Sequence, residues 1–268
     1  MQPLQLGISR LALIVASEKG GVRKTSTAAV LHDYWEESGF DVTLVQVDKQ
    51  GRLDALFPGR VITIDMPTTA DMRADDLADA RALAPALDIL LSPNPGVRIF
   101  DIGANFDRRY FDWAVSMGLA EDCRKLGIDV IGLVPMTSDA DAVTLGARTA
   151  VRFGLAFPDY LTLPVLCDDG VDVTKLLDSN TRQVFERAFG AKVERGEFLK
   201  HHRLLPGALA MLEASRLSAV QFAASAPTDL VRVTGQHVSV VRQVRADVTM
   251  YVAATFDEFT RVFPLGDA

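Results

Sequence analysis

The sequence contains only two cysteines, Cys123 and Cys167, in 268 residues. Neither their number nor their spacing fits a disulfide framework or a zinc site, so we expect two semi-buried thiols and a reducing, cytoplasmic compartment. Long hydrophobic runs are also missing, since no apolar stretch approaches the roughly 18 residues that a membrane-spanning helix needs. The apolar run at residues 11–16 is only six residues long and leads directly into the glycine-rich loop. We therefore expect a strand there and no signal sequence.

The sequence has fewer basic than acidic residues, so that its net charge is −7 and its pI is about 5.1. This balance excludes a general binder of nucleic-acid backbones, and any contact with DNA would need a local basic patch. The hydrophobic fraction of 49% and the charged fraction of 24% are ordinary for a soluble globular protein.

Short apolar runs alternate with longer helical patterns through the first half of the chain. This alternation predicts parallel strands covered by helices. Buried strands are expected at residues 11–16, 42–47, 61–64, 97–100, 130–134 and 160–166. Helices are expected at residues 25–38, 71–86, 108–117 and 140–153, the first ended by Gly39 and the last by Gly154. The predicted fold class is α/β, with a doubly wound, mostly parallel sheet flanked by helices.

After Cys167 the pattern becomes mostly helical and contains no strand of comparable strength. Helices are expected at residues 174–189 and 206–224, and one long helix within residues 228–263. The long helix carries a single apolar stripe, which favours packing against its own domain over an irregular coiled coil. We interpret residues 1–268 as a single domain, with a core at about 8–166 and a helical C-terminal part at about 170–268.

The segment after the first predicted strand carries the strongest chemical signal. Its residues are Lys19, Gly20, Gly21, Val22, Arg23, Lys24, Thr25 and Ser26. Between a strand and an amphipathic helix, such a loop turns successive backbone N–H groups and the helix N-terminus toward an anion. Lys24 would then reach the β and γ phosphates of a nucleotide, and the Thr25 hydroxyl would ligate a bridging Mg²⁺. The alternative is a plain strand-to-helix turn with a solvated lysine.

This loop resembles the deviant Walker A motif, KGGxGK[ST], of the ParA/MinD-like P-loop ATPases. The resemblance implies that ATP and Mg²⁺ are the cofactors. It also implies that Lys19 reaches across an ATP-sandwich homodimer to the phosphates bound by the partner subunit. Arg23 departs from the motif, which has glycine there, and a Cβ in the backbone conformation common at that position costs on the order of 1–2 kcal/mol. We expect nucleotide binding to be retained and hydrolysis to be slowed or altered.

Two further strand ends resemble motifs of the same family. Asp48 opens the segment 48–51, which is similar to the family's DPQG but has Lys49 in place of the proline. The resemblance implies that Asp48 orients or activates the attacking water, and the alternative is a turn or cap residue. Asp101 resembles the Walker B acid and would hold Mg²⁺ through a water. Because ligands of open α/β sheets bind at the carboxyl ends of the strands, the three motifs are expected to converge.

The resemblance implies a cytoplasmic, dimerising ATPase that acts as a switch to position or segregate cargo, as in DNA or plasmid partition, with a partner protein that stimulates hydrolysis. Two alternatives stay open. One is an accessory ATPase of plasmid transfer, and the other is a nucleotide-binding interaction module whose hydrolysis Arg23 has impaired. The family's adenine-contacting asparagine is not evident at residues 164–169, so the base is implied by the resemblance alone.

Arginines of the helical part form the candidate surface for non-specific DNA binding, which some family members have. They are Arg216, Arg232, Arg242, Arg245 and Arg261. The pair His201 and His202 is interpreted as part of a solvated charged stretch, because adjacent residues on a helix do not share a face for a metal. Binding to membranes is not expected, since residues 256–263 are too acidic for an amphipathic membrane helix.

Overall fold

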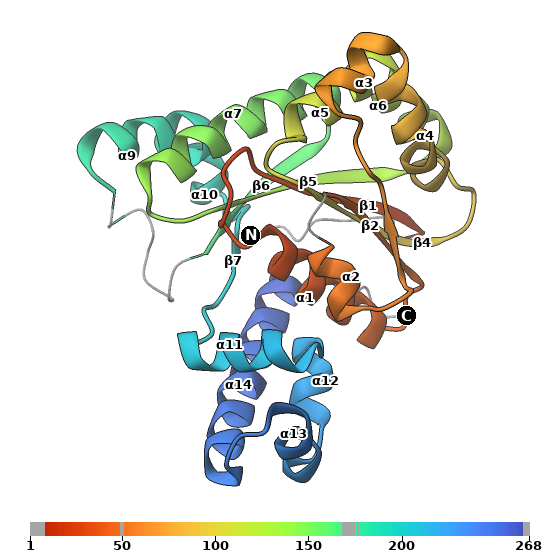
Figure 1. Cartoon of the computed structure of the whole chain (residues 1–268). Coiled ribbons are helices and arrows are strands. Elements are labelled where there is room, and N and C mark those ends of the chain that lie inside the picture. Colours follow the sequence, from red (N-terminus) through yellow and green to blue (C-terminus); the bar gives the residue numbers. More distant parts are fainter. Residues whose placement is uncertain (1–8, 49–50, 168–174, 176, 265–268) are drawn as a thin grey trace.

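The computed structural model of the chain describes residues 9–48, 51–167, 175 and 177–264. At its centre lies a seven-stranded sheet in the order β3-β2-β4-β1-β5-β6-β7 (Figure 1). The strands are β1 (Arg10–Ala16), β2 (Val42–Val47), β3 (Val61–Thr63), β4 (Gly96–Ile102), β5 (Asp129–Met136), β6 (Leu161–Leu166) and β7 (Leu199–Lys200). All neighbouring pairs among them are parallel. Strand β1 is central, and the chain winds outward from it in both directions.

Helices cover both faces of this sheet (Figure 1). One face carries α4 (Ala78–Leu90), α5 (Asp107–Ser116), α6 (Leu119–Leu126) and α7 (Ala140–Ala156). The other carries α1 (Lys24–Glu37), α2 (Arg52–Leu56) and helices from the C-terminal part. The side chains of β1 alternate between the two cores, with Leu11, Leu13 and Val15 on the α1 side and Ala12, Ile14 and Ala16 on the α7 side. The doubly wound α/β prediction is confirmed.

The C-terminal part adds helices at two places. Beside α7 lie α9 (Ser179–Phe185), a π-helical turn (Glu186–Gly190) and α10 (Ala191–Glu194). Below the sheet in Figure 1 lies a group that we call the helical lobe, made of α11 (Pro206–Ser215), α12 (Ala219–Ala224), α13 (Pro227–Thr234) and α14 (Val238–Val262). Helix α14 packs against α1, β7 and the other helices of the lobe. Packing of the long helix on its own domain is thereby confirmed.

The helical lobe buries the outer face of α1. Ala28, Leu31 and Trp35 on the sheet side are fully buried, and Tyr34 lies in contact with the rings of Phe256 and Phe259 on α14. Helix α1 is therefore enclosed along most of its length between the sheet and the helical lobe.

Three helix predictions are wrong in their extent, because caps interrupt the apolar periodicity. The range 71–86 is divided between α3 (Thr69–Ala74), which starts with a capping box of Thr68 and Asp71, and α4. The range 206–224 is divided by Arg216 in a left-handed conformation and by a capping box at Ser218. Gly235 ends α13 and divides the predicted long helix in the same way.

Smaller differences follow from weaker local signals. Helix α7 continues past Gly154 to Ala156. Helices α2 and α6 and the two-residue strand β7 were not predicted. The predicted helix at 174–189 lies partly outside the described residues. Neither cysteine forms a disulfide, and both are fully buried, whereas semi-buried thiols were expected. Among the helices that the structure describes, none combines the length and hydrophobicity needed to cross a membrane.

Candidate functional site

The glycine-rich loop leaves the carboxyl end of the central strand β1 and enters α1. Gly21 has φ 77° and Arg23 has φ 65°, so both lie in the left-handed region. A Cβ built on Gly20 or Gly21 would meet no atom within 4 Å. The loop therefore borders open space, and Arg23 adopts the conformation that glycine tolerates best. Of the other loop residues, Val22 is buried, whereas Lys19, Thr25 and Ser26 are partly exposed.

Lys24 is a nearly buried cation at the start of α1, with an exposed fraction of 8%. Its Nζ donates a hydrogen bond to the Lys19 carbonyl oxygen at 2.8 Å. Burial lowers the pKa of Lys24, and the charges of Asp101, Asp107 and Asp48 oppose that shift. Within the described residues Lys24 makes no salt bridge. A buried ammonium beside open space fits the binding of an anion.

Thr25 and Asp101 meet at the carboxyl end of β4. The Thr25 hydroxyl donates to Asp101 Oδ2 at 2.7 Å. Asp101 is 2% exposed, and burial raises its pKa to about 6, against the hydrogen bond from Thr25 and the charge of Lys24. A hydroxyl and a carboxylate are oxygen ligands of the kind that Mg²⁺ prefers. A divalent cation here would compensate the buried carboxylate, so this pair fits the predicted metal.

Asp48 follows β2 and lies beside this cluster. A Cβ on Gly103 would come within 3.1 Å of the Asp48 carboxyl carbon. The charge of Asp48 raises the pKa of both Lys24 and Asp101. The three strand ends that the sequence singled out are thus brought together. Lys49 and Gln50, which follow Asp48, lie outside the described residues.

Lys19 extends from the loop toward the first turn of α7. Its Nζ lies 3.6 Å from Asp139 Oδ2 and 3.3 Å from Asp141 Oδ2. All three side chains are partly or largely exposed. In the single subunit, two carboxylates of the same chain therefore hold this ammonium.

A second group of contacts on α7 holds the start of the loop, and sequence reasoning missed it. The Glu18 backbone N–H donates to Thr149 Oγ1 at 3.0 Å. Arg152 pairs with Glu18 Oε2 at 2.9 Å and with buried Asp107 Oδ2 at 3.0 Å, and the Thr149 hydroxyl also donates to Asp107. Burial raises the pKa of Asp107, and the Arg152 charge opposes this. These residues are far apart in the sequence and form no motif.

The prediction that His201 lies in a solvated stretch is wrong. Its side chain is buried, with Nδ1 3.0 Å from Thr27 Oγ1 and Nε2 3.0 Å from the Tyr251 hydroxyl. Burial lowers the pKa of His201 to about 3, helped by the charges of Arg23 and His202. The charged residues around His201 suggested exposure, because strand β7, which ends just before His201, is too short to show in the hydrophobic pattern.

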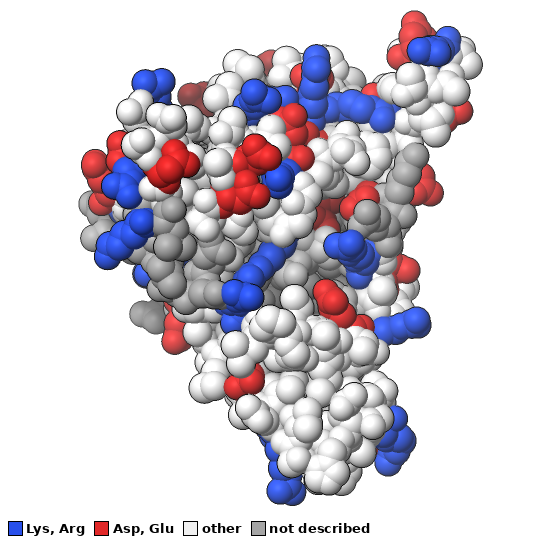
Figure 2. All heavy atoms as spheres, turned by 60° about the vertical axis from the view of Figure 1, so that its left-hand side comes forward, with Lys and Arg blue, Asp and Glu red and all other residues white. Residues whose placement is uncertain are grey.

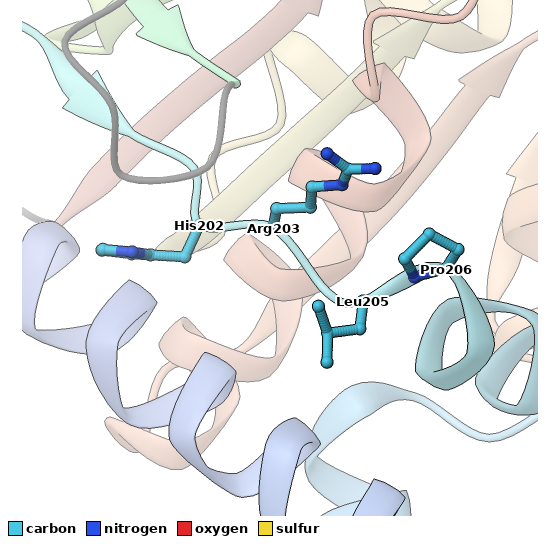
Figure 3. A pocket seen from close by; sticks show the side chains of 4 residues that line it. All are labelled: His202, Arg203, Leu205 and Pro206. Atoms are coloured by element: carbon cyan, nitrogen blue, oxygen red, sulfur yellow. The ribbon is translucent and has the colours of Figure 1, made fainter.

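The residues after His201 line an open hollow next to α1 and the helical lobe. Its lining residues are His202, Arg203, Leu205 and Pro206, and its volume is about 360 Å³ (Figure 3). In Figure 3 the imidazole of His202 points away from Arg203, and the Leu205 and Pro206 side chains lie on the α11 side. The hollow combines apolar walls with two basic side chains.

The arginines of the helical part differ in their surroundings. Arg216, Arg232 and Arg242 are exposed, and Arg245 is partly buried. Arg261 pairs with Glu258 at 2.7 Å and donates to the carbonyl oxygens of Gly196 and Phe198, so its guanidinium serves internal packing. On the face seen in Figure 2, the few blue side chains of the lower part of the molecule are scattered.

A comparison with known families bears on this arrangement. A family model described as the CobQ/CobB/MinD/ParA nucleotide binding domain matches residues 13–149, just over half of the chain. The chain belongs to this family. The match includes the glycine-rich loop, Asp48 and Asp101, whereas His201 and the helical lobe lie beyond it.

Several solved structures are similar to the chain at low sequence identity. The MinC:MinD cell division complex of Aquifex aeolicus has 12% identity and a TM-score of 0.49, covering 88% of this chain and 96% of that one. A plasmid partition protein of Borrelia burgdorferi has 14% identity and a TM-score of 0.44, covering 72% and 89%. Apo McdA of Cyanothece has 13% identity and a TM-score of 0.46, covering 88% and 98%. No curated protein sequence matches this family member.

Proposed function

We propose that the chain binds and hydrolyses ATP with Mg²⁺, as an ATPase switch that dimerises and positions or segregates cargo in the manner of DNA partition. The observation that carries this proposal is the buried Lys24 beside the Thr25–Asp101 pair, in a loop that belongs to a nucleotide-binding family. The buried ammonium of Lys24 matches the phosphates, and the oxygen pair matches a divalent metal.

Each side chain has a distinct role in this proposal. Lys24 would bind the β and γ phosphates. Thr25, and Asp101 through a water, would hold Mg²⁺, which when bound would supply positive charge beside the phosphate oxygens. Asp48 orients the water that attacks the γ phosphorus, whose bond to the β–γ bridging oxygen breaks to leave ADP and inorganic phosphate. Backbone N–H groups of residues 20–25 surround the phosphates.

The nucleoside end of ATP is assigned to the hollow of His202, Arg203, Leu205 and Pro206. Two observations support this assignment. The hollow follows β7, whose carboxyl end lies on the same edge of the sheet as the loop. His201, one residue before it, contacts Thr27 on α1 at 3.0 Å. A base between Leu205 and Pro206 would gain apolar contact.

Arg23 is compatible with nucleotide binding. Burial lowers the pKa of His201 and raises that of Tyr251, and the charge of Arg23 adds to the first shift and opposes the second, so the guanidinium lies within electrostatic reach of the helical lobe. We expect this member to bind ATP through Lys24 and to turn it over slowly. Accessory transfer ATPase activity stays a second candidate, since it uses the same site.

Dimerisation is tested by light scattering after gel filtration, with and without a non-hydrolysed ATP analogue and Mg²⁺. The wild type is expected to shift from monomer to dimer, and Lys19→Ala is expected to stay monomeric while still binding nucleotide. Lys125→Ala serves as a control, because Lys125 is exposed and pairs with its helix neighbour Glu121. A wild type that binds the analogue and stays monomeric would contradict the switch.

Cargo is tested separately, by titration of ATP-bound protein with DNA at several salt concentrations. Binding that weakens with salt, and weakens further in the Arg232→Ala/Arg242→Ala double variant, would support DNA as cargo. Equal binding by the double variant and the wild type would contradict the role of these arginines.

A further inference from the structure

A chain of hydrogen bonds links the helical lobe to the glycine-rich loop. Tyr251 on α14 contacts His201 Nε2 at 3.0 Å, and His201 Nδ1 contacts Thr27 Oγ1 at 3.0 Å. The Thr27 hydroxyl in turn donates to the Arg23 carbonyl oxygen at 2.9 Å. Tyr251, His201 and Thr27 are all buried. The contacts connect elements that are 174 and 50 positions apart in the sequence.

The direction of each hydrogen bond in this chain follows from counting protons. Thr27 has one hydroxyl proton, which it gives to Arg23, so its oxygen can only accept from His201. His201 is neutral at ordinary pH, because burial and the charges of Arg23 and His202 bring its pKa to about 3. A neutral imidazole carries one N–H, which is therefore on Nδ1, and Nε2 accepts from the Tyr251 hydroxyl.

The end point of the chain is the carbonyl of the residue with left-handed backbone. The Arg23 oxygen also accepts the Thr27 N–H at 2.9 Å, so two donors hold it. Because the peptide unit is planar and trans, fixing the Arg23 carbonyl fixes the Lys24 N–H in the opposite direction. That N–H belongs to the group of donors that surrounds an anion at the start of a helix. Through these hydrogen bonds the helical lobe fixes the direction of the Lys24 N–H, one of the donors expected to face a phosphate.

We propose that His201 and Tyr251 are positioning residues, through which the helical lobe holds the phosphate loop in its nucleotide-binding conformation. The coupling to nucleotide rests on the proposed function, whereas the hold on the loop does not. Through the same hydrogen bonds, a bound nucleotide that fixes the loop also fixes α14, because coupling between two sites is reciprocal. The same series of hydrogen bonds also offsets the backbone strain of a non-glycine residue at position 23.

The test compares Tyr251→Phe, which removes only the hydroxyl, with Tyr34→Phe. Tyr34 is a matched control, because its hydroxyl also joins α1 to the end of α14, at Thr260 Oγ1 and the Phe263 carbonyl oxygen, but far from the loop. Hydrogen–deuterium exchange of nucleotide-free protein is followed in peptides that cover residues 20–27. We expect exchange there to become about 3- to 10-fold faster in Tyr251→Phe, the range of one lost hydrogen bond, and to stay unchanged in Tyr34→Phe.

A second pair of variants distinguishes a local effect on the loop from a general loss of stability. Thr27→Ser keeps the hydroxyl and should preserve slow exchange, whereas Thr27→Val has a similar shape without it and should behave like Tyr251→Phe. Exchange in peptides of β1 serves as the internal reference for global unfolding. Loop exchange that is unchanged in both Tyr251→Phe and Thr27→Val would overturn the proposed hold on the loop.

Nucleotide affinity separates this proposal from the proposed function. Tyr251→Phe is expected to bind Mg–ATP about 3- to 10-fold more weakly than the wild type, and Tyr34→Phe equally well. Faster loop exchange with unchanged ATP affinity would overturn the coupling. If the wild type itself fails to bind ATP, the proposed function fails, and the exchange measurement still decides whether the lobe holds the loop.

Discussion

Arg23 affects both the backbone conformation of the glycine-rich loop and the proposed ATP turnover. Its φ of 65° places a side chain where glycine is favoured, at a cost of about 1–2 kcal/mol. Replacing it with glycine removes that strain but adds flexibility to the unfolded chain, which costs roughly 0.5–1 kcal/mol. We therefore expect Arg23→Gly to change the free energy of unfolding little and to raise ATP turnover. Steady-state turnover and ATP affinity, compared with the wild type, check this, and equal values of both would refute it.

Asp101 should make the nucleotide-free protein sensitive to pH. Its folded-state pKa of about 6 lies above the ordinary value of 3.8 for an aspartate, so the folded state binds the proton more tightly than the unfolded state. The resulting stabilisation is complete below pH 3.8 and is lost as the pH rises through about 6. Asp101→Asn should therefore stabilise the nucleotide-free protein by up to about 3 kcal/mol at pH 7.5 and much less at pH 4.

Denaturant unfolding at both pH values, with exposed Asp112→Asn as control, measures this effect. A stability difference between Asp101→Asn and the wild type that is the same at both pH values would show that burial of Asp101 is not its cause. In the presence of Mg–ATP the sign should reverse, since the variant loses a ligand of the metal.

At the scale of elements, the contact between β5 and α7 is a sensitive one. A Cβ on Gly132 would come within 2.6 Å of the Phe153 ring, so the core is closely packed at this point. We expect Gly132→Ala to destabilise the fold by about 1–3 kcal/mol through overpacking. Gly154→Ala, on the same helix α7 but with no atom within 4 Å of the new Cβ, should instead stabilise by about 0.5–1 kcal/mol. Thermal unfolding of both variants checks the contrast, and equal effects would count against it.

Elements with a strong apolar period were predictable from the sequence, and those defined by side-chain caps were not. Strands β1, β2 and β6 begin and end within one residue of expectation, because strands buried on both faces are uninterrupted apolar runs. The breaks before α4, α12 and α14 depend on Asp75, Ser218 and Gly235. Such residues also occur within helices, so the periodicity alone favoured longer ones.

For the site, the motifs indicated which residues meet but not what holds them. Lys24, Thr25, Asp48 and Asp101 lie at strand ends or at the helix start, where topology brings them together. The supports from Arg152, Thr149 and His201 depend on how α7 and β7 pack, which no local pattern encodes.

At the scale of the molecule, the chain combines a family core with a helical lobe that encloses its first helix. The family match ends within α7, so the helical lobe lies beyond the matched residues. The organisation as one domain stays a prediction, and the shared core of α1, α14 and β7 supports it. The overall negative charge restricts any DNA contact to local arginines.

The central claim is that the glycine-rich loop binds Mg–ATP through Lys24. Calorimetric titration of wild type, Lys24→Ala and the surface control Lys125→Ala with Mg–ATP tests it most directly. We predict saturable binding by the wild type and the control, and at least about 10-fold weaker binding by Lys24→Ala, since a buried cation would no longer face the phosphates. No binding by the wild type, or equal affinity of Lys24→Ala and wild type, would contradict the claim.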